Sequence, residues 1–460
     1  MRLAELIGIV KENFYLAVVV VIALGVLFFL LNRSSMHHGK GDTKKRLVLL
    51  ALFIGYLIMV IGVTFLNRGP GYTSNVDLSL FSSYREAWYL YSTRHWQFIY
   101  LNILMFVPFG ILVPLLNPRF KQALWMIGAA MLFTLSIESL QLITGYGTFE
   151  ADDLFNNLLG AVIGYGLTMG FLSLKEKKGV KSSLIYLTPL LVTVILFGSI
   201  FAYYHSKEYG NLSIVPANRA DMKQAEVTTN VTLDGSRKTV PVYRAPSYTK
   251  ERADEFAGEF FGRMKIDPAE IEDISYPDEG LYRVHGDSAY QLSFRFLDGS
   301  HSLTDFSLLD DGREPEDADE GKVKASLKKY GLEIPSEASF QRIDTGKYEW
   351  TVDQEASGNR LTDGELSVTY YNDGTVKEFD NRLVTYEKQK DVRIKSEQEA
   401  YQELLKGKFQ HFSENRKIGS LQIDEVRISY ALDSKGYYQP VYAFQSIVDG
   451  TEMTILVPGI

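Results

Sequence analysis

Long apolar runs dominate the first 204 residues. A bilayer core about 30 Å thick needs about 20 apolar residues per helical span. Six stretches meet this requirement: 14–31, 47–66, 98–116, 122–143, 153–174 and 184–204. The first starts too late for a signal peptide and shows no small-residue cleavage site before the basic cluster that follows it. The pattern therefore predicts an all-α bundle of six transmembrane helices.

Residues 205–460 show shorter, mixed periodicities. Helical patterns appear at 250–261, 322–330 and 397–405, where Ser396 and Glu399 form a capping-box pattern. Alternating segments typical of strands lie at 290–297, 348–353, 423–431 and 438–447, and residues 365–379 read as a hairpin around Asn372–Gly374. We predict an α+β domain built of two or three repeated helix-then-strands units. The acidic run at 310–320 reads as a solvated turn.

These patterns divide the chain into four parts. Residues 1–44 hold the first helix and a basic loop, 45–174 the central membrane domain, 175–204 the sixth helix, and 205–460 the α+β domain. The whole chain has 460 residues and a mean hydropathy of −0.06, which would suit a soluble protein. That average hides two unlike halves.

Charge separates the halves and sets their orientation. Residues 1–204 carry 16 basic and 10 acidic side chains, whereas residues 205–460 carry 32 and 46, a net charge of −14. The loops after spans one, three and five hold 11 Lys and Arg, against five on the opposite side. Because cytoplasmic loops carry the basic excess, we expect a multi-pass protein of the cell membrane whose N-terminus and C-terminal domain are both extracytoplasmic.

Composition also excludes several classes of function. The chain has no Cys, so disulfides, Cys-ligated zinc and thiol nucleophiles are excluded. Its acidic balance argues against nucleic-acid binding, and no zinc motif, phosphate-binding Gly loop or Ser-His-Asp signature occurs. We expect no metal site and no cofactor. An outer domain without disulfides must be held by core packing, which suits a Gram-positive cell envelope.

A few polar residues inside the spans are the candidate chemistry. Side chains of this kind are costly in a membrane and usually face the bundle interior or a watery cavity. The candidate ligand-binding residues are Asn102 and Pro108 in span three, Glu138 and Gln141 in span four, and Asp152, Asp153 and Asn157 in span five. The directions of the spans place the polar groups near the outer leaflet. Gly160 and Gly164 form a small-residue stripe that permits close helix packing.

Two interpretations of these polar groups remain open. Glu138 or Asp153 is a candidate general base or part of a ligand site, because neighbouring carboxylates repel and shift one another's pKa. Alternatively, Glu138 accepts hydrogen bonds from nearby amides and locks three helices together. One of Asp152 and Asp153 also suits the ordinary role of capping the start of its own helix.

Three strings in these spans resemble the VanZ-like family. They are N-x-x-x-F-x-P-F-G, S-I-E-x-x-Q and D-D-x-x-x-N-x-x-G-A-x-x-G, and the resemblance covers about residues 45–170. The matching positions are Asn102, Phe106, Pro108, Phe109, Gly110, Ser136, Glu138, Gln141, Asp152, Asp153, Asn157, Gly160 and Gly164. The resemblance implies a membrane protein linked to teicoplanin-type glycopeptide resistance. Residues 205–460 faintly resemble PepSY-like modules in the order of helices and strands.

Three functions follow from these observations. In the first, an outer-leaflet polar pocket binds a membrane lipid or a lipid-linked cell-wall precursor. In the second, the bundle only anchors residues 205–460, which act as a sensory module or bind an envelope protein. In the third, the protein is an enzyme that modifies an envelope lipid. We rank the first function ahead of the second, and the enzyme last.

Overall fold

The computed structural model describes residues 40–66, 76–91, 93–177, 179–216, 219–285, 290–306, 313–409 and 417–460. The chain forms two compact units. Among the described residues, the first comprises 40–87 together with Thr93–Lys207, and the second comprises Trp88–Ser92 and Glu208–Ile460. The predicted first span at 14–31 lies outside the described residues.

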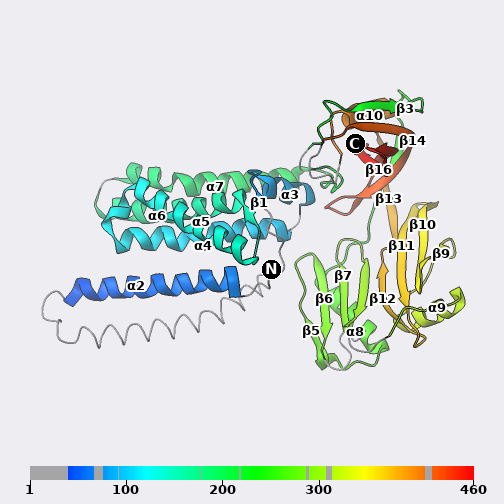
Figure 1. The fold of residues 1–460 in the computed structure, drawn as a ribbon, viewed down its shortest axis with the longest axis horizontal. Helices are drawn as coiled ribbons and strands as arrows, with labels where there is room; N and C mark the ends of the chain where they lie inside the picture. Colours follow the sequence, from blue (N-terminus) through cyan, green and yellow to red (C-terminus); the bar gives the residue numbers. More distant parts are fainter. Residues whose placement is uncertain are drawn as a thin grey trace. The chain divides into compact units, whose positions relative to one another are not determined.

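The first unit is helical (Figure 1). Its elements are α2 (Lys40–Ile61), a π-helical turn (Gly62–Leu66), α3 (Ser82–Leu90), α4 (Thr93–Leu116), α5 (Ala123–Thr144), α6 (Ala151–Lys175) and α7 (Val180–Ser206), with the short strands β1 (Val76–Asp77) and β2 (Phe149–Glu150). The end of α3, from Trp88 on, belongs to the second unit. In the described part of the chain, five helices are long and apolar enough to cross a membrane. They confirm five of the six predicted apolar spans.

Helix α6 is the centre of this unit, since α4, α5 and α7 all pack against it. Glycines allow the closest of these approaches. A Cβ atom at Gly160 would lie 1.9 Å from the carbonyl oxygen of Ile103, and one at Gly164 would lie 2.1 Å from that of Val107. A Cβ at Gly110 on α4 would lie 2.0 Å from the carbonyl oxygen of Ala161. Helices α4 and α6 therefore meet backbone to backbone.

The second unit is built on a mixed sheet. Its strands are β3 (Glu226–Thr229), β4 (Thr239–Arg244), β5 (Ile271–Asp273), β6 (Glu279–Val284), β7 (Tyr290–Arg295), β8 (His301–Asp305), β9 (Ser339–Asp344), β10 (Lys347–Ser357), β11 (Arg360–Tyr370), β12 (Val376–Asn381), β13 (Val384–Arg393), β14 (Ser420–Leu432), β15 (Tyr437–Val448) and β16 (Thr451–Pro458). The order of the main path is β3-β14-β15-β4-β13-β11-β12-β8-β7-β6-β5, with β10 joined to β11 and β9, and β16 joined to β15. Only the β3–β14 pair is parallel among the described pairs of this sheet.

Three helices precede groups of strands, as the sequence predicts. They are α8 (Lys250–Arg263), α9 (Glu320–Leu327), which continues into a 3₁₀ turn (Lys328–Tyr330), and α10 (Glu397–Leu405). The predicted capping box opens α10: the Ser396 hydroxyl accepts from the Glu399 amide at 3.2 Å, and the Glu399 carboxylate accepts from the Ser396 amide at 2.8 Å. The predicted hairpin is also present, because β11 and β12 pair antiparallel.

The sheet carries two main hydrophobic cores. The side chain of Trp350 is fully buried in the core beneath α8 and α9, and those of Tyr442 and Phe444 are fully buried in the core beneath α10. Strand β11 changes partner between these cores, pairing with β13 over residues 360–363 and with β12 over residues 366–370. Gly364 sits at the change with φ of +118°, and a Cβ there would lie 2.1 Å from the carbonyl oxygen of Arg382. Only glycine fits that position without strain.

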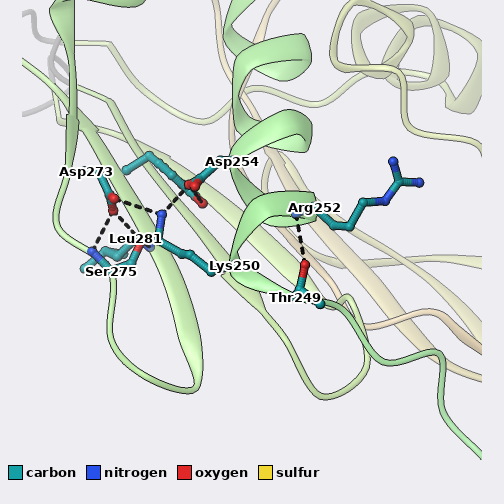
Figure 2. A network of polar contacts seen from close by, with 8 residues as sticks. Thr249, Lys250, Arg252, Asp254, Asp273, Ser275 and Leu281 are labelled. Atoms are coloured by element: carbon teal, nitrogen blue, oxygen red, sulfur yellow. Dashed lines mark hydrogen bonds and ion pairs between the residues drawn. The ribbon is translucent and has the colours of Figure 1, made fainter.

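A polar network ties the start of α8 to the β5–β6 hairpin (Figure 2). The Lys250 ammonium donates to Asp254, and its Nζ lies 2.8 Å from Oδ2 of Asp273. The Tyr282 hydroxyl donates to Asp254 at 2.7 Å. Desolvation lowers the pKa of Lys250, but the bonds to the two carboxylates outweigh it and raise the pKa above its ordinary value. The ion pairs are partly exposed, so each adds little stability.

His301 gives the second unit a pH dependence. Its ring lies 4.9 Å from that of Phe256 and 6.0 Å from that of Phe379, centroid to centroid, and its Nδ1 is 3.0 Å from the Gly299 carbonyl oxygen. Desolvation among these rings lowers the pKa of His301. Below about pH 6.5 the unfolded chain therefore binds a proton that the folded unit does not, so stability falls as the pH falls.

We expect His301→Gln to flatten this loss of stability between about pH 8 and about pH 5. The measurement is hydrogen exchange of peptides from β7 and β8 in the full-length protein at a series of pH values. His285→Gln is the matched control, because the His285 side chain is 65% exposed and pairs with Glu272 at the surface. Equal pH slopes for wild type and His301→Gln would contradict the assignment.

Candidate functional site

Two acidic residues open α6 and point to different partners. The Asn102 amide on α4 donates a hydrogen bond to the Asp153 carboxylate, which joins the polar residues of two spans. Both side chains are half-buried rather than enclosed. The structure therefore brings this predicted pair together and leaves part of it accessible.

Asp152, by contrast, is 1% exposed and binds the start of another helix. Its carboxylate accepts from the amides of Phe81 and Ser83, the latter at 2.8 Å, and from the Ser83 hydroxyl. The N-cap position of α6 is Glu150, whose side chain makes no capping bond. Asp152 thus caps α3, where its charge meets the positive end of the helix dipole. The sequence had suggested that one of Asp152 and Asp153 caps the start of α6 itself.

Two neighbouring asparagines continue the polar face of α6. Asn156 accepts a hydrogen bond from the Tyr84 hydroxyl on α3. Asn157 donates from Nδ2 to the Thr134 hydroxyl on α5 at 2.9 Å. Both amides are 1% exposed, so they join helices rather than face the surroundings.

The polar stripe on α5 is buried along its length. Thr134, Glu138 and Gln141 are 0%, 2% and 5% exposed. Gln141 donates to the carbonyl oxygen of Thr64 in the π-helical turn at 3.4 Å. Pro108 lies inside α4 and is half-buried. The polar cluster, defined here as Asn102, Thr134, Glu138, Gln141, Asp152, Asp153, Asn156 and Asn157, therefore links α4, α5 and α6.

An aromatic group adjoins the polar cluster. Tyr84 stacks on Phe197 with ring centroids 6.3 Å apart, and Tyr100 meets the same ring edge-on at 5.0 Å. Trp96 stacks on Tyr100 at 6.1 Å. Tyr100 is 40% exposed, so one of these rings is accessible. Amphipathic rings of this kind suit the boundary between lipid and water.

Several members of the site could not be predicted from the sequence. Phe81, Ser83 and Tyr84 lie in a loop between spans that has no long periodic pattern, and Thr64 lies at the end of a uniformly apolar run. One local signal was present: Asp77 accepts from the Ser79 amide at 2.8 Å and from the Ser82 hydroxyl at 3.0 Å, which is a turn that precedes a helix.

The accessible groups of the site define its chemistry. Carboxylate and amide oxygens accept hydrogen bonds, and the aromatic rings offer flat, apolar faces. Such a set suits ligands rich in hydroxyl, amide or ammonium donors. The five spanning helices and the buried polar cluster together fit a multi-pass membrane protein.

Comparison with known proteins identifies the membrane segment. Residues 53–173 match the family described as VanZ/LLP1. This match confirms the resemblance carried by the three motifs and covers the segment from α2 to α6. No curated protein matches the chain.

Two solved structures are similar to the chain at low identity. An uncharacterized protein from Eubacterium rectale is 9% identical, with a TM-score of 0.27, covering 51% of this chain and 87% of its own. The C-terminal domain of Bacillus megaterium YpeB is 10% identical, with a TM-score of 0.22, covering 47% of this chain and 94% of its own.

Proposed function

We propose that this chain is a cell-envelope membrane protein whose VanZ-like segment binds the head group of a lipid-linked cell-wall precursor. The observation that carries the proposal is the half-buried Asn102–Asp153 pair, together with the accessible ring of Tyr100, which joins the polar cluster through Phe197 and Tyr84. The pair supplies hydrogen-bond acceptors, and the ring supplies a face on which a sugar packs.

The remaining polar residues support this site as a frame. Asp152 fixes the start of α3, and α3 in turn directs Tyr84 toward Asn156 and Phe197. Buried hydrogen bonds such as these hold helices in one arrangement. We assign them to positioning, and we assign contact with the ligand to Asn102 and Asp153.

The apolar surface of the spanning helices accounts for the lipid part of the ligand. Helices α4 and α5 expose apolar side chains such as Leu104 and Leu132, which are compatible with a lipid tail beside the bundle. The excess of Lys and Arg in the opposite loops supports an orientation in which the polar cluster faces the outer leaflet.

A cellular experiment tests the proposal. In a host strain lacking the protein, Asp153→Ala supplied in place of wild type is expected to increase susceptibility to teicoplanin to the level of an empty vector. Ser136→Ala is the control, because the Ser136 hydroxyl is exposed and donates to the Leu132 carbonyl oxygen of its own helix. Protein levels are compared by immunoblot. Equal susceptibility for Asp153→Ala and wild type at equal protein levels would contradict the link between this site and teicoplanin resistance that the VanZ-like resemblance implies.

The alternative is that residues 205–460 carry the function and the bundle only anchors them. The net charge of −14 and the two hydrophobic cores make this part suited to bind an envelope protein. A fusion of residues 205–460 to one unrelated span separates the two ideas. Our proposal predicts that the fusion leaves the deletion phenotype unchanged, whereas full rescue would favour the anchored module.

A further inference from the structure

A second candidate site lies farther along α6, toward the loops that carry basic residues. A cleft of about 490 Å³ opens between α5, α6 and α7. Its volume falls in the range of small-molecule sites, which is about 300–1,000 Å³. None of the polar-cluster residues lines it.

The walls of the cleft are mostly apolar. Met126 and Ala130 come from α5, Ala161 from α6, and Ile185 and Pro189 from α7. Met126, Ala130 and Ala161 are buried, while Ile185 is 65% exposed. The cleft therefore has an apolar floor and an open side, as a site for a hydrocarbon chain requires.

One end of the cleft is polar and basic. Lys121 and Gln122 line this end, and the Tyr165 hydroxyl donates to the Lys121 carbonyl oxygen at 2.8 Å. Tyr165 also meets Tyr186 edge-on, with ring centroids 6.2 Å apart. The backbone at Lys121 is thus fixed, while its side chain is exposed.

Other positive charges lie at the same end of the helices. Arg119 shares the 3₁₀ turn (Pro118–Lys121) with Lys121, Lys175 ends α6, and Lys181 lies in the first turn of α7. Glu176 is the single acidic residue in the described parts of the segments that connect α4 to α5 and α6 to α7. A lipid whose tail fills the cleft would place its head group within this positive field.

From these observations we propose that the cleft between α5, α6 and α7 binds one acyl chain of an anionic phospholipid, whose head group pairs with Lys121. The apolar floor selects a hydrocarbon chain, and the basic end selects negative charge over a zwitterionic head group. This site is separate from the one in the proposed function, and either can fail without the other.

Photocrosslinking in vesicles tests this inference. The full-length protein carries benzoylphenylalanine in place of Ile127, which lines the cleft and is 40% exposed, or in place of Leu132, a control on the same helix that is 69% exposed and does not line it. The vesicles contain equal amounts of phosphatidylglycerol and phosphatidylcholine. Adducts at position 127 are expected to be about fivefold richer in phosphatidylglycerol than adducts at position 132.

Charge variants then locate the head group. Lys121→Gln is expected to abolish the enrichment at position 127, whereas Lys177→Gln, exposed at the same end and outside the cleft, is expected to preserve it. Equal lipid composition at positions 127 and 132 would overturn the proposal. Adducts at position 127 to residues 14–31 or to a second copy of the chain would overturn it as well, because they would show that protein fills the cleft.

Discussion

Leucine in place of Gly160 is expected to abolish the folded membrane unit. The Cβ alone would lie 1.9 Å from the Ile103 carbonyl oxygen, 2.9 Å from its carbonyl carbon and 3.2 Å from its Cα. All three atoms belong to the backbone of α4, so no change of side-chain rotamer relieves the clash. Overpacking of an adaptable core costs about 1–3 kcal/mol, and we expect a larger loss where two helix backbones must separate.

Gly128 on α5 supplies the matched control for this substitution. A Cβ at that position meets no atom within 4 Å. Gly128→Leu is therefore expected to leave the protein as stable as wild type. The two variants place the same side chain in a spanning helix, so they differ only in what the new side chain meets. The measurement is the thermal unfolding midpoint of the full-length protein in detergent, together with its yield. Similar yields and midpoints for the two variants would contradict the backbone contact between α4 and α6.

Alanine in place of Asp152 is expected to release the start of α3. The change leaves the amides of Phe81 and Ser83 and the Ser83 hydroxyl without their acceptor. Each unsatisfied, fully buried donor costs about 1–3 kcal/mol. Because these three donors are only part-buried, we expect a smaller total loss of about 2–5 kcal/mol in the stability of this segment. Hydrogen exchange of a peptide covering residues 80–90 is expected to accelerate by at least about 30-fold.

Asp153 provides the control that separates the capping role of Asp152 from a general effect of removing a carboxylate. Asp153→Ala removes the same group one residue later, but Asp153 is half-buried and its bond goes to Asn102. We expect exchange at residues 80–90 to stay near the wild-type rate in that variant. Equal acceleration in the two variants would show that Asp152 does not cap α3.

The membrane part of the fold was predictable because its signals are local. Each span is a continuous apolar run, so its existence needs no knowledge of its neighbours. The Asn102–Asp153 pair was accessible to the same reasoning, since alternating directions place both residues at one depth. The partner of Asp152 was not, because Ser83 precedes it by 69 residues and lies in a loop without periodicity.

In the second unit, helices were easier to predict than the sheet. Ser396 and Glu399 mark the start of α10 within four residues of sequence, and the Asn372–Gly374 turn fixes one hairpin. The order of the strands depends instead on distant pairs. Strand β3 lies beside β14, and β4 lies between β13 and β15, and no local pattern specifies such neighbours. Tyr438, which packs on Tyr386 with ring centroids 4.0 Å apart, reads in sequence only as a strand residue.

Binding of a purified lipid-linked disaccharide-peptide wall precursor to the full-length protein in nanodiscs tests the central claim most directly. Hydrogen bonds to a charged group contribute about 1.5–3 kcal/mol, so Asp153→Ala is expected to raise the Kd by about 10-fold to 100-fold. Asn102→Ala is expected to weaken binding in the same direction, and Ser136→Ala is expected to match wild type. A Kd unchanged in both Asp153→Ala and Asn102→Ala, with both variants folded, would contradict the account.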